Sequence, residues 1–339
     1  MDCKAVLFDL RGDSLSEKPL MLRPLLFCPV LTWVCRELQE RGMERFVVLC
    51  DEAHRSSAEQ AVSAFDAAVF SEESEARSSA GEALVLDRPV LPLPSEDGLS
   101  GLMILEDADA LRNRIPACRD RLLNRLESQG VTVVDPFNTY VDPTCSVGAG
   151  TVLLPGTILR GMTRIAANCE IGPNAMIRDS IIGEETTVNA SQVNESTVGC
   201  HTTLGPFAYI RPNCRIGDHC RVGDFVEMKN SVIGDGTKIS HLTYVGDSDV
   251  GQRVNFGCGT VTTNYDGHKK YRCTIGDDVF LGCNTNLIAP VTLGDGSYTA
   301  AGTTVTDDVP ADALAIARSR QTNISGWAAR FRKTWKKKD

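Results

Sequence analysis

An aliphatic residue followed by glycine recurs from Val147 onward, and this repeat constrains the fold more than any other feature of the sequence. Several intervals between repeats are six residues or close to a multiple of six. A six-residue period is typical of a parallel β-helix, in which three short strands form one triangular coil and successive coils stack. The dipeptides include Val147-Gly148, Ile171-Gly172, Ile182-Gly183, Val198-Gly199, Leu204-Gly205, Ile216-Gly217, Val222-Gly223, Ile233-Gly234, Val250-Gly251, Ile275-Gly276, Leu281-Gly282 and Leu293-Gly294.

Other periodic folds fit this segment poorly. It is rich in Gly, Pro, Asn, Asp, Thr and Val, which are unfavourable inside helices. An antiparallel sheet would alternate with a period of two over longer strands. One inward aliphatic per face fills a narrow core, which agrees with an aromatic content of only 6%. Six of the 29 glycines fall in residues 1–130, so the repeat belongs to the second part of a chain with two unlike halves.

Two segments interrupt the period. One is His241 to Asp247, and the other is Thr262 to Cys273, which reads as a polar loop expelled between coils. The final segment, Ser325 to Asp339, is expected to begin as a helix and end as a basic tail. Its charge opposes that of a chain with a formal net charge of -9, which favours a local role such as holding phosphates.

The front of the chain predicts a different domain. Residues 1–50 read as strand, loop, helix and strand, and residues 108–129 read as a helix in which Pro116 marks a break or a start. We therefore expect an α/β domain over 1–107, a linker helix over 108–130, a β-helix over 131–324 and a basic tail over 325–339.

Composition excludes several classes. Hydrophobic and charged residues make up 42% and 23% of the chain, as in ordinary soluble domains. No apolar run reaches the ~20 residues of a membrane span, and the N-terminus lacks the pattern of a signal peptide. The 13 cysteines include no C-x-x-C pair, so free thiols in a reducing cytoplasm are the favoured interpretation. Nothing indicates nucleic-acid binding.

The second half also carries longer motifs: LGPFAYIRP, VGDFVEMKNSVIGDGTKISHLTYVGD, VNFGCGTVTTNYDGHKK, IGDDVFLGCNTNLIAPVTLGDGS and AAGTTVTDDVPADALAIARSRQ. With these motifs the segment resembles the acetyltransferase domain of the bifunctional N-acetylglucosamine-1-phosphate uridyltransferase/glucosamine-1-phosphate acetyltransferase family. The resemblance implies a left-handed β-helix, a homotrimer with active sites between neighbouring solenoids, and acetyl transfer from acetyl-CoA to glucosamine 1-phosphate. In that family the product leads to UDP-N-acetylglucosamine and peptidoglycan. The resemblance implies no metal for acetyl transfer.

A base must deprotonate the amine of the acceptor before it attacks the thioester, and histidine suits that task near neutral pH. The resemblance places His241 in that position and makes Glu227 a candidate for orienting it. A structural histidine at a coil corner and a solvated acid are the alternatives. For the sugar phosphate the resemblance implies Arg211, Lys229, Tyr244, Asn255 and Lys270. Each alone would read as a surface residue.

For acetyl-CoA the matching positions are Asn264, Tyr265, Cys283, Ala301 and Arg318, with Lys333, Lys336, Lys337 and Lys338 of the tail as possible phosphate partners. Asn264 and Tyr265 also fit a simple turn. Cys283 departs from the serine common in the family, and a thiol is a weaker hydrogen-bonding group than a hydroxyl. A covalent acetyl-cysteine is disfavoured because no base stands beside it in the sequence.

The α/β domain resembles a truncated, degenerate remnant of the family's Rossmann-like nucleotidyltransferase domain. Its loop DLRGDSLSEK holds one glycine, Gly12, where nucleotide-binding loops need several. Leu20 stands at the family's lysine position, and Arg88-Pro89 replaces the Gly-Asp that would hold magnesium; Asp87 is a weak alternative ligand. These losses predict that uridyl transfer is absent and that a separate protein supplies it.

Two other functions stay open from the sequence. One is a different hexapeptide amino-sugar N-acyltransferase, with another acyl chain or a nucleotide-linked acceptor. The other is a non-catalytic assembly or regulatory protein in which both domains have lost activity. The residues around His241 favour the acetyltransferase over both.

Overall fold

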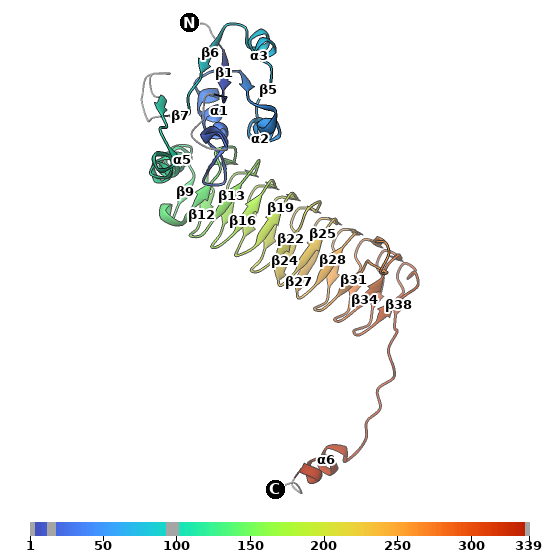
Figure 1. The fold of residues 1–339 in the computed structure, drawn as a ribbon. Coiled ribbons are helices and arrows are strands. Elements are labelled where there is room, and N and C mark those ends of the chain that lie inside the picture. Colours follow the sequence, from blue (N-terminus) through green and yellow to red (C-terminus); the bar gives the residue numbers. More distant parts are fainter. Residues whose placement is uncertain (1–3, 12–17, 93–101, 336–339) are drawn as a thin grey trace.

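The computed structural model describes residues 4–11, 18–92 and 102–335. An α/β unit stands at one end of a long solenoid, and an extended segment at the other end leads to an isolated helix (Figure 1). In the described part of the chain, no helix has the length and apolar composition needed to cross a bilayer.

The α/β unit is built on a parallel sheet with the order β5-β4-β1-β6, formed by β1 (Ala5–Asp9), β4 (Arg45–Leu49), β5 (Ala67–Phe70) and β6 (Ala83–Leu86). One face of the sheet, with Phe8 and Phe46, packs on α1 (Val30–Glu40) and α2 (Arg55–Val62). The other face packs on α3 (Glu73–Ala80) through Ala76 and Ala80. The expected order of strand, loop, helix and strand is confirmed.

Short elements complete this unit and join it to the solenoid. They are η1 (Leu20–Leu22), β2 (Pro24–Leu25), β3 (Cys28–Pro29), η2 (Glu52–His54), β7 (Val90–Pro92), β8 (Leu102–Ile104), α4 (Ala108–Arg112), α5 (Ile115–Ser128) and η4 (Pro136–Asn138). The single linker helix expected over 108–129 is wrong, because the chain breaks between α4 and α5. Pro116 lies in the first turn of α5, where its missing N–H costs nothing.

The rest of the chain up to Ala315 winds as a left-handed parallel β-helix with three sheets. The first sheet contains β10 (Tyr140–Val141), β13 (Ile158–Arg160), β16 (Met176–Arg178), β19 (Gln192–Asn194), β22 (Tyr209–Ile210), β25 (Glu227–Lys229), β28 (Tyr244–Gly246), β31 (Val261–Thr263), β34 (Asn286–Ile288) and β37 (Thr304–Val305). The second contains β11 (Ser146–Val147), β14 (Arg164–Ile165), β17 (Ile181–Ile182), β20 (Thr197–Val198), β23 (Arg215–Ile216), β26 (Val232–Ile233), β29 (Ser248–Val250), β32 (Cys273–Ile275) and β35 (Val291–Leu293). The third contains β9 (Thr132–Val133), β12 (Val152–Leu153), β15 (Glu170–Ile171), β18 (Thr187–Val188), β21 (Thr203–Leu204), β24 (Arg221–Asp224), β27 (Lys238–His241), β30 (Asn255–Phe256), β33 (Phe280–Leu281), β36 (Tyr298–Thr299) and β38 (Leu314–Ala315).

The inward aliphatic residues predicted from the repeat form the core. In the first sheet Ile177, Val193 and Ile210 occupy successive coils and are fully buried. Burying one such side chain contributes about 1.5–3 kcal/mol relative to leaving it exposed. Glycine is needed where coils meet at a corner: a Cβ on Gly199 would lie 2.6 Å from the carbonyl carbon of Gly217. The six-residue repeat therefore encodes both the core and the corners.

Aspartates tie neighbouring coils together at one corner. Asp218 accepts a hydrogen bond from the backbone N–H of Cys200 at 2.7 Å, and Asp235 accepts one from Asp218 at 2.8 Å. Asp277 and Asp295 repeat the contact further along. Each carboxylate satisfies a backbone donor that a tight turn leaves unpaired.

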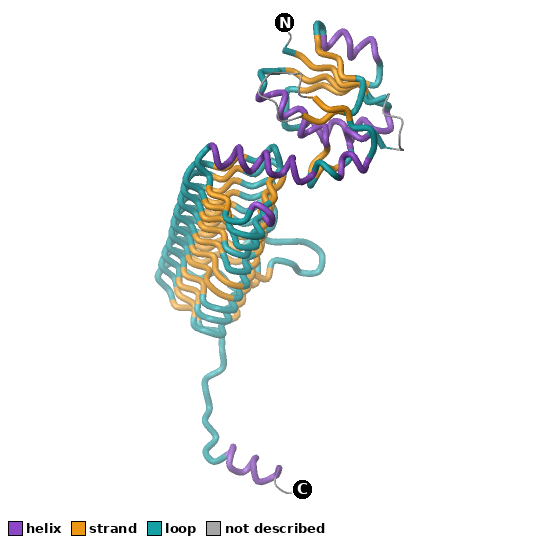
Figure 2. The backbone as a smooth tube through the Cα atoms, turned by 90° about the vertical axis from the view of Figure 1, so that its left-hand side faces the viewer, coloured by secondary structure: helices purple, strands orange, loops and turns teal. Residues whose placement is uncertain are grey.

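Of the two predicted interruptions, only one leaves the solenoid. Between β31 and β32 the chain forms a loop that projects from the body (Figure 2). The interruption expected at His241 to Asp247 is wrong, because β27 and β28 stay in their sheets. Lys238 pairs with Asn255, only 17 residues along, so this coil is merely one residue shorter than three hexapeptides.

The C-terminal helix α6 (Trp327–Trp335) stands apart from the solenoid (Figure 1) and buries none of its residues. Phe331 contacts Trp327 and Trp335, with ring centroids 4.8 and 5.5 Å away. The expected helical start of the tail is confirmed. Lys336, Lys337 and Lys338 lie outside the described residues, as does Gly12 of the front loop.

Asp142 lies buried in the first coil, beside the α/β unit. Its Oδ2 accepts a hydrogen bond from the Gly161 N–H at 2.7 Å, while its Oδ1 is buried without a hydrogen-bond partner among the described residues. Burial raises the pKa of this carboxyl from 3.8 to about 6, and the bond from Gly161 offsets only part of that effect. The folded state therefore binds the proton more tightly than the unfolded chain, and the free energy of unfolding falls as the pH rises through 6.

We predict that Asp142→Asn raises the free energy of unfolding by about 1–2 kcal/mol at pH 7.5, because it removes a buried charge. The gain should disappear near pH 4, where Asp142 is protonated. Denaturant unfolding at the two pH values measures this difference. Asp179→Asn is the matched control, since Asp179 accepts a similar bond from Met162 at an exposed position. An equal gain at both pH values would contradict the assignment.

Candidate functional site

His241 and Asp224 form a close pair at one corner of the solenoid. His241 ends β27 and Asp224 ends β24, and the two residues stand opposite each other in the parallel ladder. Nδ1 of His241 lies 2.8 Å from Oδ1 of Asp224. When Nδ1 carries the proton and donates it to Asp224, Nε2 is left with a free lone pair. The geometry thus presents an exposed imidazole that can accept a proton.

The pKa of Asp224 is lowered, chiefly by the hydrogen bond from His241. This contact corrects the sequence-based expectation for Glu227 as the group that orients His241. Glu227 instead accepts a hydrogen bond from Arg211 at 2.7 Å, one coil away in the first sheet. The bond to Asp224 holds one ring orientation and favours the positively charged imidazolium.

Three cations gather on the other side of the same corner. Arg211 follows β22, Lys229 ends β25, and Lys270 belongs to the projecting loop. The pKa of Lys229 is lowered, first by the neighbouring Lys270 and to a smaller extent by Arg211. Like charges are destabilising at close range unless an anion shares them. The structure therefore brings together three of the five predicted phosphate-site residues in an arrangement that favours an anion.

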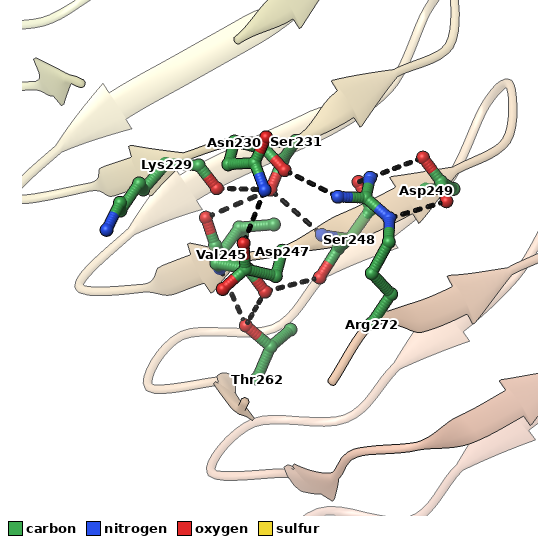
Figure 3. Close-up of polar contacts among 10 residues, drawn as sticks. Lys229, Asn230, Ser231, Val245, Asp247, Ser248, Asp249, Thr262 and Arg272 are labelled. Carbon is green, nitrogen blue, oxygen red and sulfur yellow. Dashed lines mark hydrogen bonds and ion pairs between the residues drawn. The ribbon is translucent and has the colours of Figure 1, made fainter. Parts of the chain in front are cut away.

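The projecting loop is fixed at both ends (Figure 3). At its start, Nδ2 of Asn264 donates a hydrogen bond to buried Asp247, which also accepts one from Asn230 at 2.5 Å. At its end, Arg272 donates to Asp249 at 2.9 Å and to the carbonyls of Asn230 and Ser248. These contacts hold the segment that carries Lys270.

The loop also has internal order. Tyr265 and Lys270 form a β-bridge, and Oδ1 of Asp266 accepts hydrogen bonds from the N–H groups of His268 and Lys269, each at 2.7 Å. The Tyr265 hydroxyl donates to the carbonyl of Gly267 at 2.7 Å. The turn considered for Asn264 and Tyr265 is thus present. It leaves Tyr265 exposed and Asn264 buried.

Tyr244 and Asn264 both border Gly246. A Cβ on Gly246 would lie 2.3 Å from the Tyr244 hydroxyl and 2.8 Å from Nδ2 of Asn264. Glycine is required here by the close approach of these side chains. Asn255 lies elsewhere, at the start of β30 in the third sheet and paired with Lys238.

The corner that carries His241 continues toward the C-terminus. The N–H of Leu242 donates to the carbonyl of Asp224, and the same kind of contact joins Asn284 to Cys258 and Gly302 to Cys283, at 2.8–2.9 Å. We call this edge the His241 corner: Asp224, His241, Cys258, Cys283 and Ala301. It aligns the predicted base with Cys283 and Ala301, two predicted acetyl-CoA positions. Arg318 follows the last coil and is exposed.

Lys333 is not brought to this corner, because α6 stands away from the solenoid (Figure 1). Asp224, Asp247 and Arg272 were missed from the sequence. The first two are each 17 residues before a predicted site residue, His241 and Asn264. A 17-residue spacing, the length of one short coil, was the signal that could have found them.

Large apolar residues protrude near His241. Phe207, Phe225 and Leu242 occupy successive coils and are 58%, 57% and 58% exposed. Their φ angles are +61°, +57° and +44°, in the left-handed region that bulky residues rarely adopt. The rings of Phe207 and Phe225 stack with centroids 5.5 Å apart. We call these three residues the apolar ridge.

In the α/β unit, ion pairs occupy the edge of the sheet where a nucleotide site would be expected. Arg11 contacts Asp9 at 2.7 Å and Glu73 at 2.9 Å, and Glu73 also pairs with Arg77. Leu20 is buried and lies in the hydrophobic core. Among the described residues, no group of three or more His, Cys, Asp or Glu could hold a metal ion.

Comparisons with known proteins agree with this architecture. The family model described as bacterial transferase hexapeptide (six repeats) matches residues 195–230 and 272–307. The bifunctional protein GlmU of Caldanaerobacter subterraneus subsp. tengcongensis is 53% identical over 217 residues, which are 64% of this chain and 48% of that protein. GlmU of Bacillus velezensis is 49% identical over 229 residues, 68% of this chain and 50% of its own.

This chain resembles the GlmU proteins. The resemblance stated from the motifs is confirmed, and the chain spans about half the length of the curated relatives it matches. Among solved structures, an Arabidopsis UDP-N-acetylglucosamine acyltransferase matches with 15% identity over 59% of this chain and 75% of that one, at a TM-score of 0.36.

We predict that His241→Ala returns the pKa of the Asp224 carboxyl toward its ordinary value, because the principal cause of its lowering is the bond from His241. Carbon-detected NMR titration of the aspartate carboxyls measures this change. Glu227 should titrate alike in both proteins, since its partner Arg211 is retained. An unchanged Asp224 pKa would show that the pair is not formed in solution.

Proposed function

We propose that this protein is an N-acetyltransferase that transfers the acetyl group of acetyl-CoA to the amine of glucosamine 1-phosphate. The observation that carries the proposal is the position of the His241–Asp224 pair, next to three converging cations around one corner. A general base beside an anion site is what an amino-sugar phosphate requires. The GlmU resemblance, which covers about two thirds of this chain, supports the same reaction.

In the proposed reaction, Nε2 of His241 accepts a proton from the acceptor amine as the nitrogen attacks the thioester carbonyl. The N–C bond forms, the C–S bond breaks, and the CoA thiolate leaves and takes up a proton. Asp224 acts as a positioning residue, because it keeps the proton on Nδ1 and stabilises the imidazolium that forms. No resident metal enters this scheme.

The phosphate of the acceptor would bind Arg211, Lys229 and Lys270. An arginine offers a planar pair of donors, while each lysine offers a point charge. A bound phosphate would also relieve the repulsion between the two ammonium groups. Tyr244 and Asn264 are placed to contact the sugar, and Asn255 is proposed to contribute from the third sheet.

Acetyl-CoA would lie along the His241 corner toward Cys283 and Ala301. Tyr265 and Arg318 are the other proposed contacts in the described chain, with the lysines of the tail as phosphate partners. A thiol at Cys283 gives a weaker contact than a hydroxyl. Because Lys333 stands away from the corner within one chain, its contribution would need either movement of the tail or a neighbouring subunit.

We propose that the working form is a homotrimer in which the apolar ridge is covered by a second copy. Exposed stacked phenylalanines in a strained backbone are unfavourable in an isolated chain. Their position next to His241 would place the active site at the subunit boundary.

We propose that the α/β unit does not transfer UMP. The ion pairs of Arg11 occupy the sheet edge, and Leu20 in the core cannot act as a cation. A separate uridyltransferase would then complete the route to UDP-N-acetylglucosamine. A coupled assay for CoA release with glucosamine 1-phosphate, run beside a UTP-dependent pyrophosphate assay, tests both parts: signal in the first and none in the second is expected.

We predict that His241→Ala lowers kcat for CoA release by about 10²–10⁴-fold, because the general base is lost. His201→Ala is the control: His201 also pairs with a carboxylate, Glu185, at 3.1 Å, but at a different corner. The control should keep nearly full activity. Near-normal turnover of a folded His241→Ala protein would rule out this base.

We predict that Asp224→Asn lowers kcat by about tenfold or more with little change in KM, because it disturbs the orientation of His241 and not substrate binding. The double variant Asp224→Asn/His241→Ala should be no slower than His241→Ala alone, since both changes act through one group. Glu185→Gln is the matched control. Additive losses in the double variant would mean that Asp224 acts independently of His241.

A further inference from the structure

A cavity of about 320 Å³ lies where the α/β unit, the linker and the solenoid meet. Its walls come from α1, from β7 and β8, and from α5, and Pro143 of the first coil closes one side. Figure 1 shows α5 between the α/β unit and the first coils. The volume falls at the lower end of the range for small-molecule sites. The proposed acetyl transfer uses no residue of this cavity.

The floor of the cavity is apolar. Trp33, Leu91 and Leu122 are buried residues that line it, and Met103 packs against the same core. Nε1 of Trp33 donates a hydrogen bond to the carbonyl of Leu25 at 3.0 Å, which satisfies its polar atom and fixes the ring. The cavity therefore offers a hydrocarbon or aromatic group a preformed apolar surface.

The rim carries an excess of positive charge. Four arginines line the cavity, Arg36, Arg114, Arg121 and Arg125, against two glutamates, Glu37 and Glu40. Both carboxylates are already shared: Glu37 contacts Arg41 and Arg121, and Glu40 contacts Arg36 and Arg125.

Two arginines have capacity left for an anion. Nε of Arg36 is buried and makes no hydrogen bond to the described residues, although Glu40 lies 3.4 Å away. Arg114 begins α5 and forms no salt bridge with any residue in the described chain. A buried donor without an acceptor is costly, and a guanidinium is well suited to a carboxylate.

We propose that this cavity binds a small organic anion with an apolar body and one carboxylate. The body occupies the floor formed by Trp33, Leu91 and Leu122, and the carboxylate accepts hydrogen bonds from Arg114 at the rim. The same chemistry is offered by a medium-chain fatty acid or by a fused-ring aromatic acid. Because the occupant touches the α/β unit, the linker and the first coil, its binding stabilises the joint between them.

The test is calorimetric titration of the full chain with decanoate, 1-naphthoate and the uncharged decanol. At least one carboxylate should bind with a Kd of about 100 μM or lower, as expected for a ligand of this size. The tighter carboxylate identifies the body that fits the floor. No heat of binding at millimolar concentrations of either acid would overturn the proposal.

Variants locate the site. Arg114→Gln should weaken carboxylate binding by about tenfold and leave decanol unchanged, because only the charge-assisted bond is lost. Arg112→Gln is the matched control, since Arg112 lies two residues earlier, is exposed and does not line the cavity. Ala117→Trp places a large side chain on the exposed wall of the cavity and should abolish binding of both classes. Equal affinities in Arg114→Gln and Arg112→Gln, or unaltered binding by a folded Ala117→Trp protein, would overturn the assignment.

Discussion

The stacking of each coil on the next, through parallel ladders of two or three residues per face, is the constraint on which the rest of the molecule depends. One coil has too little surface to bury its own aliphatic residues, so stability comes from neighbours. The same stacking decides which polar groups meet. Asp224 reaches His241, Asn230 reaches Asp247 and Asp247 reaches Asn264, each pair being 17 residues apart. The candidate site is thus a product of coil length as much as of residue type.

Much of the architecture could be predicted from the sequence. The aliphatic–glycine repeat indicated the β-helix, its core positions and the expelled loop, since these depend on local pattern. The orienting partner of His241 could not be predicted in the same way. Glu227 and Asp224 are three residues apart, and whether one or the other faces the imidazole depends on whether the coil holds 17 or 18 residues. The supposed interruption at His241 to Asp247 came from the same one-residue difference.

The α/β unit was harder to interpret. Its first strands and helix follow ordinary hydrophobic patterns, and Leu20 fits the core as a leucine should. The ion pairs that join Arg11 to Asp9 and Glu73 link residues 62–64 positions apart on different elements, so no local pattern reports them. The charged cavity beside α5 is likewise a property of packing. Its arginines are spaced along two helices as on any solvated surface, and only their meeting over an apolar floor distinguishes them.

The projecting loop changes the coil in a simple way. Lys238 pairs with Asn255 after 17 residues, whereas Asn255 pairs with Phe280 after 25, yet the ladder continues on the other side as before. The extra residues are held by Asn264 and Arg272 and bear no load from the core. The solenoid thereby separates two requirements that compete in most enzymes: the loop with Lys270 can vary in length and charge, and with it the acceptor that is admitted, while the coils that carry His241 keep their register.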